Sequence, residues 1–162
     1  MFKIGQYVVY KHDVCKLVEI KKQYFNNEDY YVLESTLDKS LKINIPISKE
    51  GNLRPIITKE ETEKIINNIP KIDVIKSNDK LLEMEYKRLI NTGTFEDLIT
   101  IIKTTYLRNK KRLDANTKIS DKDNTYFLLA EKYLYNEFSI VLDKNIEETK
   151  NYIINKLEKN SK

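Results

Sequence analysis

The chain has 162 residues, of which 40% are hydrophobic and 33% charged, and a formal net charge of +4 at pH 7. This composition is typical of one or two folded domains and excludes a chain that is disordered throughout. No apolar run approaches the roughly 20 residues of a membrane-spanning helix, and the start of the chain has no secretory-signal pattern. The single cysteine, Cys15, has no internal disulfide partner, so we expect a cytoplasmic protein without membrane contact.

The first third of the chain has the residue pattern of β-strands. Two runs rich in β-branched and aromatic residues, 6–10 and 14–20, flank a polar break and predict a β-hairpin. Gly5 precedes the first run, where a strand that opens or bends needs backbone freedom. No helix start signal competes with this interpretation.

A later run, residues 41–47, alternates isoleucine or leucine with polar residues and proline, the period of a strand with one buried face. Pro46 has no N–H to donate to a ladder, so this strand is predicted to lie at the edge of the sheet. Short strands at this spacing, over residues 1–58, predict a small Tudor/SH3-like β-barrel. A free edge of such a barrel can accept a strand from another protein.

From Thr58 onward the apolar positions follow a helical period. Residues 58–61 form a capping box, and residues 59–76 are predicted to be a short helix and a connector. Residues 77–162 contain apolar stripes separated by capping residues and by Gly93, which predicts four helices in a compact bundle. The sequence thus predicts an α+β protein, with an N-terminal β-barrel followed by a C-terminal all-α helical bundle.

Residues suited to catalysis are scarce. His12 is the only histidine and the chain has three glycines, so histidine metal sites, Gly-rich phosphate loops and nucleophile elbows are absent. His12 and Cys15 lie close together in the sequence, but no oxyanion-stabilising device accompanies them, and an inert core cysteine is favoured. We expect no enzymatic activity, no catalytic residue, no metal, no cofactor and no small-molecule substrate.

Two further features bear on nucleic-acid binding. The eleven tyrosines lie mainly at predicted strand and helix positions, where packing is favoured over base stacking. The basic run 108–112 is interpreted first as a solvated helix end that the helix dipole favours, and alternatively as a patch that contacts phosphates. A net charge of +4 is low for a protein that binds nucleic acid tightly by itself, but a protein delivered by a partner needs less charge.

Several motifs resemble the CarD/CdnL family of bacterial transcription regulators. Residues 2–10, FKIGQYVVY, are similar to the family's opening pattern F-x-x-G-D-x-V-V-Y. The similarity continues in further segments, namely 30–33, 43–47, 53–55, 86–93 and the Ile119-Ser120 cap. The N-terminal part is also similar to the RNA polymerase-interacting domain of the transcription-repair coupling factor, but helicase motifs are absent.

This resemblance implies a Tudor-like barrel that binds the β subunit of bacterial RNA polymerase, and a helical domain that contacts promoter DNA at the upstream edge of the bubble. The polymerase-binding residues that it implies are Lys42, Ile43, Asn44, Ile45 and Pro46. The DNA-binding residues that we infer from it are Asn78, Lys80, Lys87, Lys122 and Asn124. Asn44 stands where relatives often carry an arginine, and Asn78 stands where the family has a tryptophan that wedges into the minor groove.

We therefore predict a transcription regulator that binds RNA polymerase through its barrel and contacts promoter DNA through its helices to modulate open-complex stability. Attachment to polymerase gives the helices a high effective concentration at the DNA, which accounts for the modest charge. Two alternatives stay open: a self-sufficient nucleic-acid-binding protein and a pure protein-interaction module. The first binds nucleic acid alone and with strong salt dependence, whereas the second does not bind it.

Overall fold

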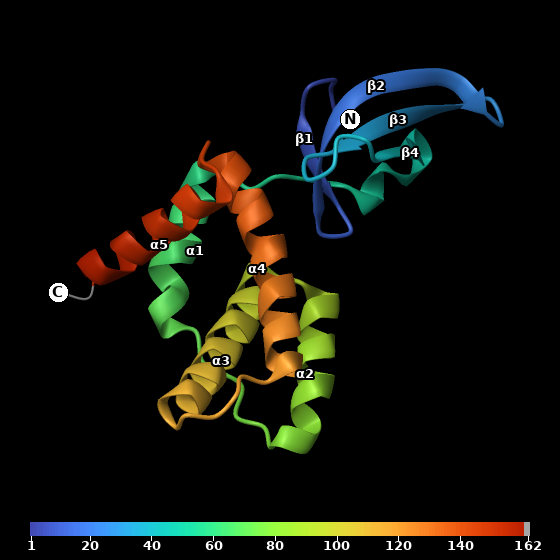
Figure 1. Ribbon diagram of the computed structural model, residues 1–162. Coiled ribbons are helices and arrows are strands. Elements are labelled where there is room, and N and C mark those ends of the chain that lie inside the picture. Colours follow the sequence, from blue (N-terminus) through green and yellow to red (C-terminus); the bar gives the residue numbers. More distant parts are fainter. Residues whose placement is uncertain (161–162) are drawn as a thin grey trace. The chain divides into compact units, whose positions relative to one another are not determined.

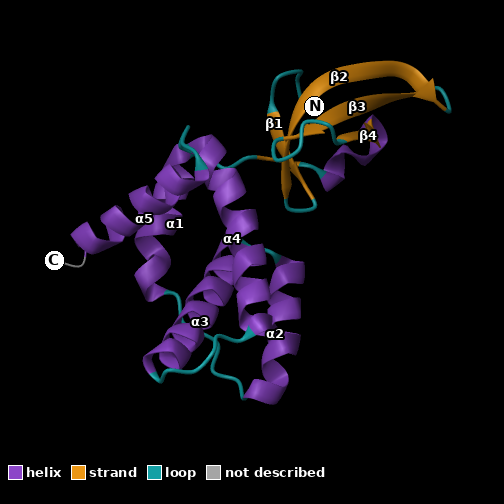
Figure 2. Cartoon of the chain, viewed as in Figure 1, coloured by secondary structure: helices purple, strands orange, loops and turns teal. Residues whose placement is uncertain are grey.

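The computed structural model describes residues 1–160 and divides the chain into two compact units, Met1–Ile57 and Thr58–Lys162. The first unit consists of strands and one short 3₁₀ segment, and the second consists of helices (Figures 1 and 2). The predicted α+β class is therefore confirmed. Within the described residues, no helix is both long and apolar enough to cross a membrane.

The first unit is a five-stranded antiparallel sheet with the strand order β4-β3-β2-β1-β5. Its elements are β1 (Tyr7–Tyr10), β2 (Asp13–Phe25), β3 (Glu28–Ser35), β4 (Lys42–Pro46), the 3₁₀ segment η1 (Ile47–Asn52) and β5 (Arg54–Pro55). The predicted Tudor-like architecture is confirmed, and the sheet is open, because β4 and β5 are its two edges and do not pair in the described chain. β5 has only two residues, and each edge strand ends in a proline without an N–H, so few donors are left to close a barrel.

The β1–β2 and β2–β3 turns each use two residues with positive φ, the twist that joins antiparallel strands tightly. The β2–β3 turn consists of Asn26 and Asn27, with φ of 52° and 56°. Asparagine tolerates this region well, whereas the β1–β2 turn places Lys11 and His12 there, with φ of 47° and 73°. Gly5 has a positive φ of 91°, which agrees with the predicted need for backbone freedom just before the first strand.

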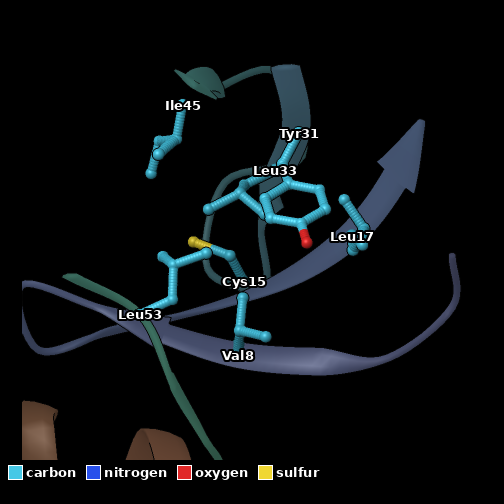
Figure 3. Packing of buried hydrophobic residues seen from close by; sticks show 7 residues of the cluster. All are labelled: Val8, Cys15, Leu17, Tyr31, Leu33, Ile45 and Leu53. Atoms are coloured by element: carbon cyan, nitrogen blue, oxygen red, sulfur yellow. The ribbon is translucent and has the colours of Figure 1, made fainter. Parts of the chain in front are cut away.

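The core of this unit is a cluster of side chains from all parts of the sheet, shown in Figure 3. Its members are Val8, Cys15, Leu17, Tyr31, Leu33, Ile45 and Leu53. The Tyr31 hydroxyl donates a hydrogen bond to Glu50 Oε2 at 2.8 Å and accepts one from the Phe2 N–H at 3.2 Å. One buried tyrosine thereby fastens the N-terminal segment and η1 to β3, the neighbour of the edge strand β4.

The second unit contains five α-helices: α1 (Lys59–Asn68), α2 (Asp79–Thr92), α3 (Phe95–Asp114), α4 (Asp121–Val141) and α5 (Ile146–Asn160), with the 3₁₀ turn η2 (Ile69–Lys71) after α1. The capping box of Thr58 and Glu61 is present, and Gly93 ends α2 in the left-handed conformation with φ of 62°, as predicted. Thr94 and Ser120 likewise cap α3 and α4 through their side chains. These local signals fix the helix ends before any tertiary contact is considered.

Residues 59–76 pack within this helical unit. Ile66 of α1 is fully buried, and the Tyr152 hydroxyl of α5 donates a hydrogen bond to Glu63 Oε1 at 2.5 Å. Lys103 Nζ of α3 donates to the carbonyl oxygens of Ile69 and Ile72, at 3.0 and 2.5 Å. The segment between α1 and α2 is thus held by side chains of α3.

Candidate functional site

The strand predicted to bind polymerase, β4, lies at an edge of the sheet. It pairs with β3 on one side, with Ile45 opposite Tyr31 and Ile43 opposite Leu33, and the described residues place no strand on its other side. The predicted edge position of the Pro46 strand is confirmed. A strand edge of this kind presents backbone N–H and C=O groups that can pair with a partner strand.

The side chains of β4 divide into two sets that follow the strand alternation. Ile45 is 5% exposed within the core cluster, and Ile43 packs against that cluster. Lys42 and Asn44 are exposed. Ile43 and Ile45 therefore hold the strand in place, and Ile45 has only its backbone to offer a partner. Lys42 and Asn44 are the β4 side chains that a partner would meet.

The hairpin of β2 and β3 extends farther than the sequence predicted. β2 was predicted to end near residue 20 and instead continues to Phe25, beyond the segment that pairs with β1 (Figure 1). Asp29 stabilises this extension, because its carboxylate accepts hydrogen bonds from the Gln23 N–H and Lys22 Nζ, each at 3.0 Å. These bonds, with the Gln23 backbone bond the largest, hold the pKa of Asp29 below its usual value. Tyr24 and Phe25, exposed by 51% and 60%, form the aromatic end of the hairpin.

Three of the predicted DNA-binding residues share one face of the helical unit. Lys80 and Lys87 are exposed on α2, seven residues apart and hence on the same side of the helix. Glu83, between them, forms ion pairs with Lys87 at 3.7 Å and with Lys122 of α4 at 3.3 Å. Lys122 and then Lys87 lower the pKa of Glu83, so its carboxylate offsets part of their charge. We call Lys80, Lys87 and Lys122 the lysine face.

The other two predicted DNA-binding residues are not part of the lysine face: Asn78 caps a helix, and Asn124 lines a separate cavity. Asn78 is the N-cap of α2, and its Oδ1 accepts the Leu81 N–H at 3.1 Å. Its position is explained by helix capping. Asn124 is two residues from Lys122 on α4, so the two side chains point to nearly opposite sides of the helix. Asn124 lines a separate cavity of about 290 Å³ between α3 and α4, together with Lys110 and Phe127.

A buried ionic cluster that the sequence did not predict lies where α2, α3 and α4 meet. Asp123 of α4 is 1% exposed and accepts hydrogen bonds from Arg112 Nη1 at 2.6 Å, Arg108 Nε at 2.9 Å and the Tyr86 hydroxyl at 2.9 Å. Burial alone would raise the pKa of Asp123, but these hydrogen bonds outweigh burial and hold the pKa below its usual value. The carboxylate is charged and joins α2, α3 and α4.

The same cluster corrects the first interpretation of the basic run 108–112. Arg108 and Arg112 are not part of a freely solvated helix end, since their side chains are 28% and 29% exposed and both contact Asp123. Their spacing of four residues, with an aspartate at a helix start nearby in the sequence, was the available signal. That signal does not identify which aspartate is buried.

Comparison with known protein families finds a match in the first unit. Residues 2–57 match the family model of the CarD-like/TRCF RID domain, where RID denotes the RNA polymerase-interacting domain. The match ends at Ile57, the last residue of the sheet unit, and includes no residue of the helices α1 to α5. No curated protein matches the chain. The N-terminal resemblance is therefore confirmed and supports a transcription-related role in binding RNA polymerase, while the resemblance within the helices stays a prediction.

Proposed function

We propose that this chain, whose N-terminal unit is a CarD-like/TRCF RID domain, is a transcription regulator that binds the β subunit of RNA polymerase through β4 and contacts promoter DNA through its helical unit. One observation carries the proposal: in a domain of a polymerase-interacting family, β4 has a strand partner on one side only. The consequence for transcription is a changed stability of the open complex.

In this proposal, addition of a polymerase strand to β4 accounts for both the affinity and the selectivity of RNA polymerase binding. The backbone of β4 supplies hydrogen bonds to a partner strand, and the exposed side chains of Lys42 and Asn44 select which strand pairs. Since Ile43 and Ile45 are packed on the core, the strand is ordered before it meets polymerase. A preordered strand loses little conformational entropy on binding.

The lysine face is the proposed DNA contact. Lys80, Lys87 and Lys122 carry three positive charges, which Glu83 reduces to a net +2. So small a charge gives weak, salt-sensitive binding to phosphates by itself. Attachment through the RID domain raises the local concentration of the helical unit at the promoter, so weak contacts suffice.

A non-enzymatic role is part of the same proposal. Cys15, the one candidate nucleophile of the sheet unit, is fully buried. Burial, and next the nearby Asp13 charge, raise the pKa of its thiol to about 11. At neutral pH the sulfur is therefore protonated, whereas thiol catalysis requires the thiolate.

The polymerase contact is tested by a charge reversal on β4. We expect Lys42→Glu to weaken binding of the full chain to core RNA polymerase by roughly tenfold, because the change affects an exposed side chain at the interface and not the core. Lys16→Glu is the matched control: Lys16 is exposed on β2, a strand that is paired on both sides. Equal affinities of Lys42→Glu and the unaltered chain would remove β4 as the docking strand.

The DNA contact is tested by the lifetime of the promoter open complex. Lys80→Ala is expected to shorten that lifetime, whereas Lys64→Ala, which changes an exposed lysine on α1, should leave it unchanged. An unchanged lifetime in Lys80→Ala argues for a pure protein-interaction module. Salt-sensitive DNA binding of full strength without polymerase would instead favour a self-sufficient nucleic-acid-binding protein.

A further inference from the structure

We propose that the helical unit contains a phosphate-binding pocket, separate from the lysine face, where α2 begins and α3 ends (Figure 1). This pocket has a volume of about 300 Å³. Its lining residues are Asp79, Arg108, Lys111, Arg112, Ala115 and Thr117. Neither the family resemblance nor the predicted DNA-binding set includes this site.

The pocket is preorganised by the buried Asp123. This carboxylate binds Arg108 Nε and Arg112 Nη1, so both guanidinium groups are held in place before any ligand arrives. A guanidinium group has five N–H donors. Arg108 uses Nε and Nη1, and Arg112 uses Nη1 alone, for hydrogen bonds within the described chain. Nη2 of Arg108, and both Nε and Nη2 of Arg112, are left as donors, and the planar Nε and Nη2 pair of Arg112 suits two oxygens of a phosphate.

The charges around the pocket favour an anion. Arg108, Lys111 and Arg112 contribute three positive charges against the two negative charges of Asp79 and Asp123, which leaves a net +1. Lys111 is exposed and forms no ion pair with any described residue. The positive end of the α2 dipole adds to this field, since α2 begins at Asp79.

The end of α3 would repel an anion if its carbonyl oxygens faced the pocket uncovered. The structure shows instead that the carbonyl oxygen of Arg112 accepts hydrogen bonds from Ala115 N–H, Thr117 N–H and Thr117 Oγ1. These donors offset the negative end of the helix dipole at the pocket wall.

Asp79 competes with the ligand. It pairs with Arg108 Nη1 at 3.0 Å, but its side chain is 82% exposed, so water can take over its solvation when a phosphate displaces it. Removal of this charge should therefore strengthen phosphate binding. Opposite effects of Asp79 and Lys111 substitutions are the signature of this pocket.

Two neighbouring lysines provide a matched experiment on the full chain. Lys111 lines this pocket, whereas Lys110 lines the other cavity, between α3 and α4. In titrations with inorganic pyrophosphate, followed by amide NMR shifts and calorimetry, we expect Lys111→Ala to weaken binding roughly threefold and Asp79→Asn to strengthen it roughly threefold. Lys110→Ala should match the unaltered chain.

The same titrations can overturn the site. Pyrophosphate that leaves the amide signals of residues 111–117 unmoved, equal affinities in Lys110→Ala and Lys111→Ala, or an affinity that does not rise in Asp79→Asn each contradict it. Because polymerase takes no part in these measurements, their failure is distinct from failure of the proposed docking at β4.

A second arm identifies the source of the phosphate, which is either a free phosphate compound or a nucleic-acid backbone. Duplex DNA that displaces pyrophosphate from the unaltered chain, and binds more weakly to Lys111→Ala, assigns the pocket to a backbone phosphate; this branch rests on the proposed DNA contact. Pyrophosphate binding that duplex DNA does not disturb assigns the pocket to a free phosphate compound.

Discussion

The sheet unit and the helical unit are stabilised in different ways. The sheet is organised around an apolar cluster, from which the Tyr31 hydroxyl reaches Glu50 and the Phe2 N–H. The helical unit is organised around a buried charge, Asp123, which ties three helices together through two arginines and one tyrosine.

This difference determines what each unit can offer a partner. The sheet leaves the backbone of β4 unpaired on one side within the described chain, so its main-chain groups are available to a partner strand. In the helical unit, Arg108 and Arg112 are bound internally, and Lys87 and Lys122 share Glu83. Few charges are left for nucleic acid, which is consistent with a unit that needs another contact to reach DNA.

The largest effect is expected from removal of the buried charge. Asp123→Asn removes the carboxylate that Arg108 and Arg112 share; loss of one partner from a buried ion pair costs about 3–5 kcal/mol, and we expect the lower end because both arginines are partly exposed and Arg108 keeps Asp79. Urea unfolding monitored by helical circular dichroism should show this loss. Asp121→Asn, an exposed aspartate in the first turn of the same helix, should unfold at nearly the unaltered urea concentration. Equal midpoints for the two variants would show that the cluster contributes little.

The second-largest expected effect is on the pH dependence of unfolding, which should differ between the helical unit and the sheet unit. The folded pKa of Asp123 is depressed, so its stabilisation is complete above the unfolded aspartate pKa of about 3.9 and is lost as the pH falls through the lower, folded value. One proton taken up on unfolding gives a slope of at most about 1.4 kcal/mol per pH unit. Helical unfolding measured from neutral to acid pH should show this loss, and Asp123→Asn should lack it. An identical slope in both proteins would assign acid sensitivity to other carboxyl groups.

A smaller effect is expected in the sheet. Tyr31→Phe removes the hydrogen bonds to Glu50 and Phe2 and should destabilise the sheet unit by about 1–2 kcal/mol. Tyrosine fluorescence during urea unfolding can measure it. Tyr30→Phe is the neighbouring control, because Tyr30 is only half-buried. If both variants unfold alike, the Tyr31 hydroxyl does not fasten η1.

The smallest expected effect is an increase in the stability of the sheet unit. Lys11 and His12 have left-handed backbone conformations that Asn-Gly adopts more easily, so Lys11→Asn combined with His12→Gly should stabilise the sheet by about 1 kcal/mol. In the other turn, Asn27→Gly should stabilise by less, since asparagine already tolerates the conformation. Thermal unfolding of both variants tests the comparison. An equal gain in the two turns would contradict strain at Lys11 and His12.

The edge position of β4 and the helix caps were predictable because their signals are local. Thr58, Gly93 and Ser120 mark helix ends through hydrogen bonds and backbone angles within a few residues. The edge position of β4 followed from the missing N–H of Pro46 and the alternation around it. Residues 2–10 also carried the family resemblance that the match to residues 2–57 confirms.

Tertiary structure alone decided the features that join distant residues. Tyr86 and Asp123 are 37 residues apart in the sequence, and only the packing of α2, α3 and α4 makes this aspartate the buried one. The open sheet likewise depends on which strands pair, since β4 and β5 become its edges only once the other strands have found their partners. Local propensity is set by the near neighbours of each residue, whereas burial of a charge depends on which surfaces meet, and a linear pattern does not specify that.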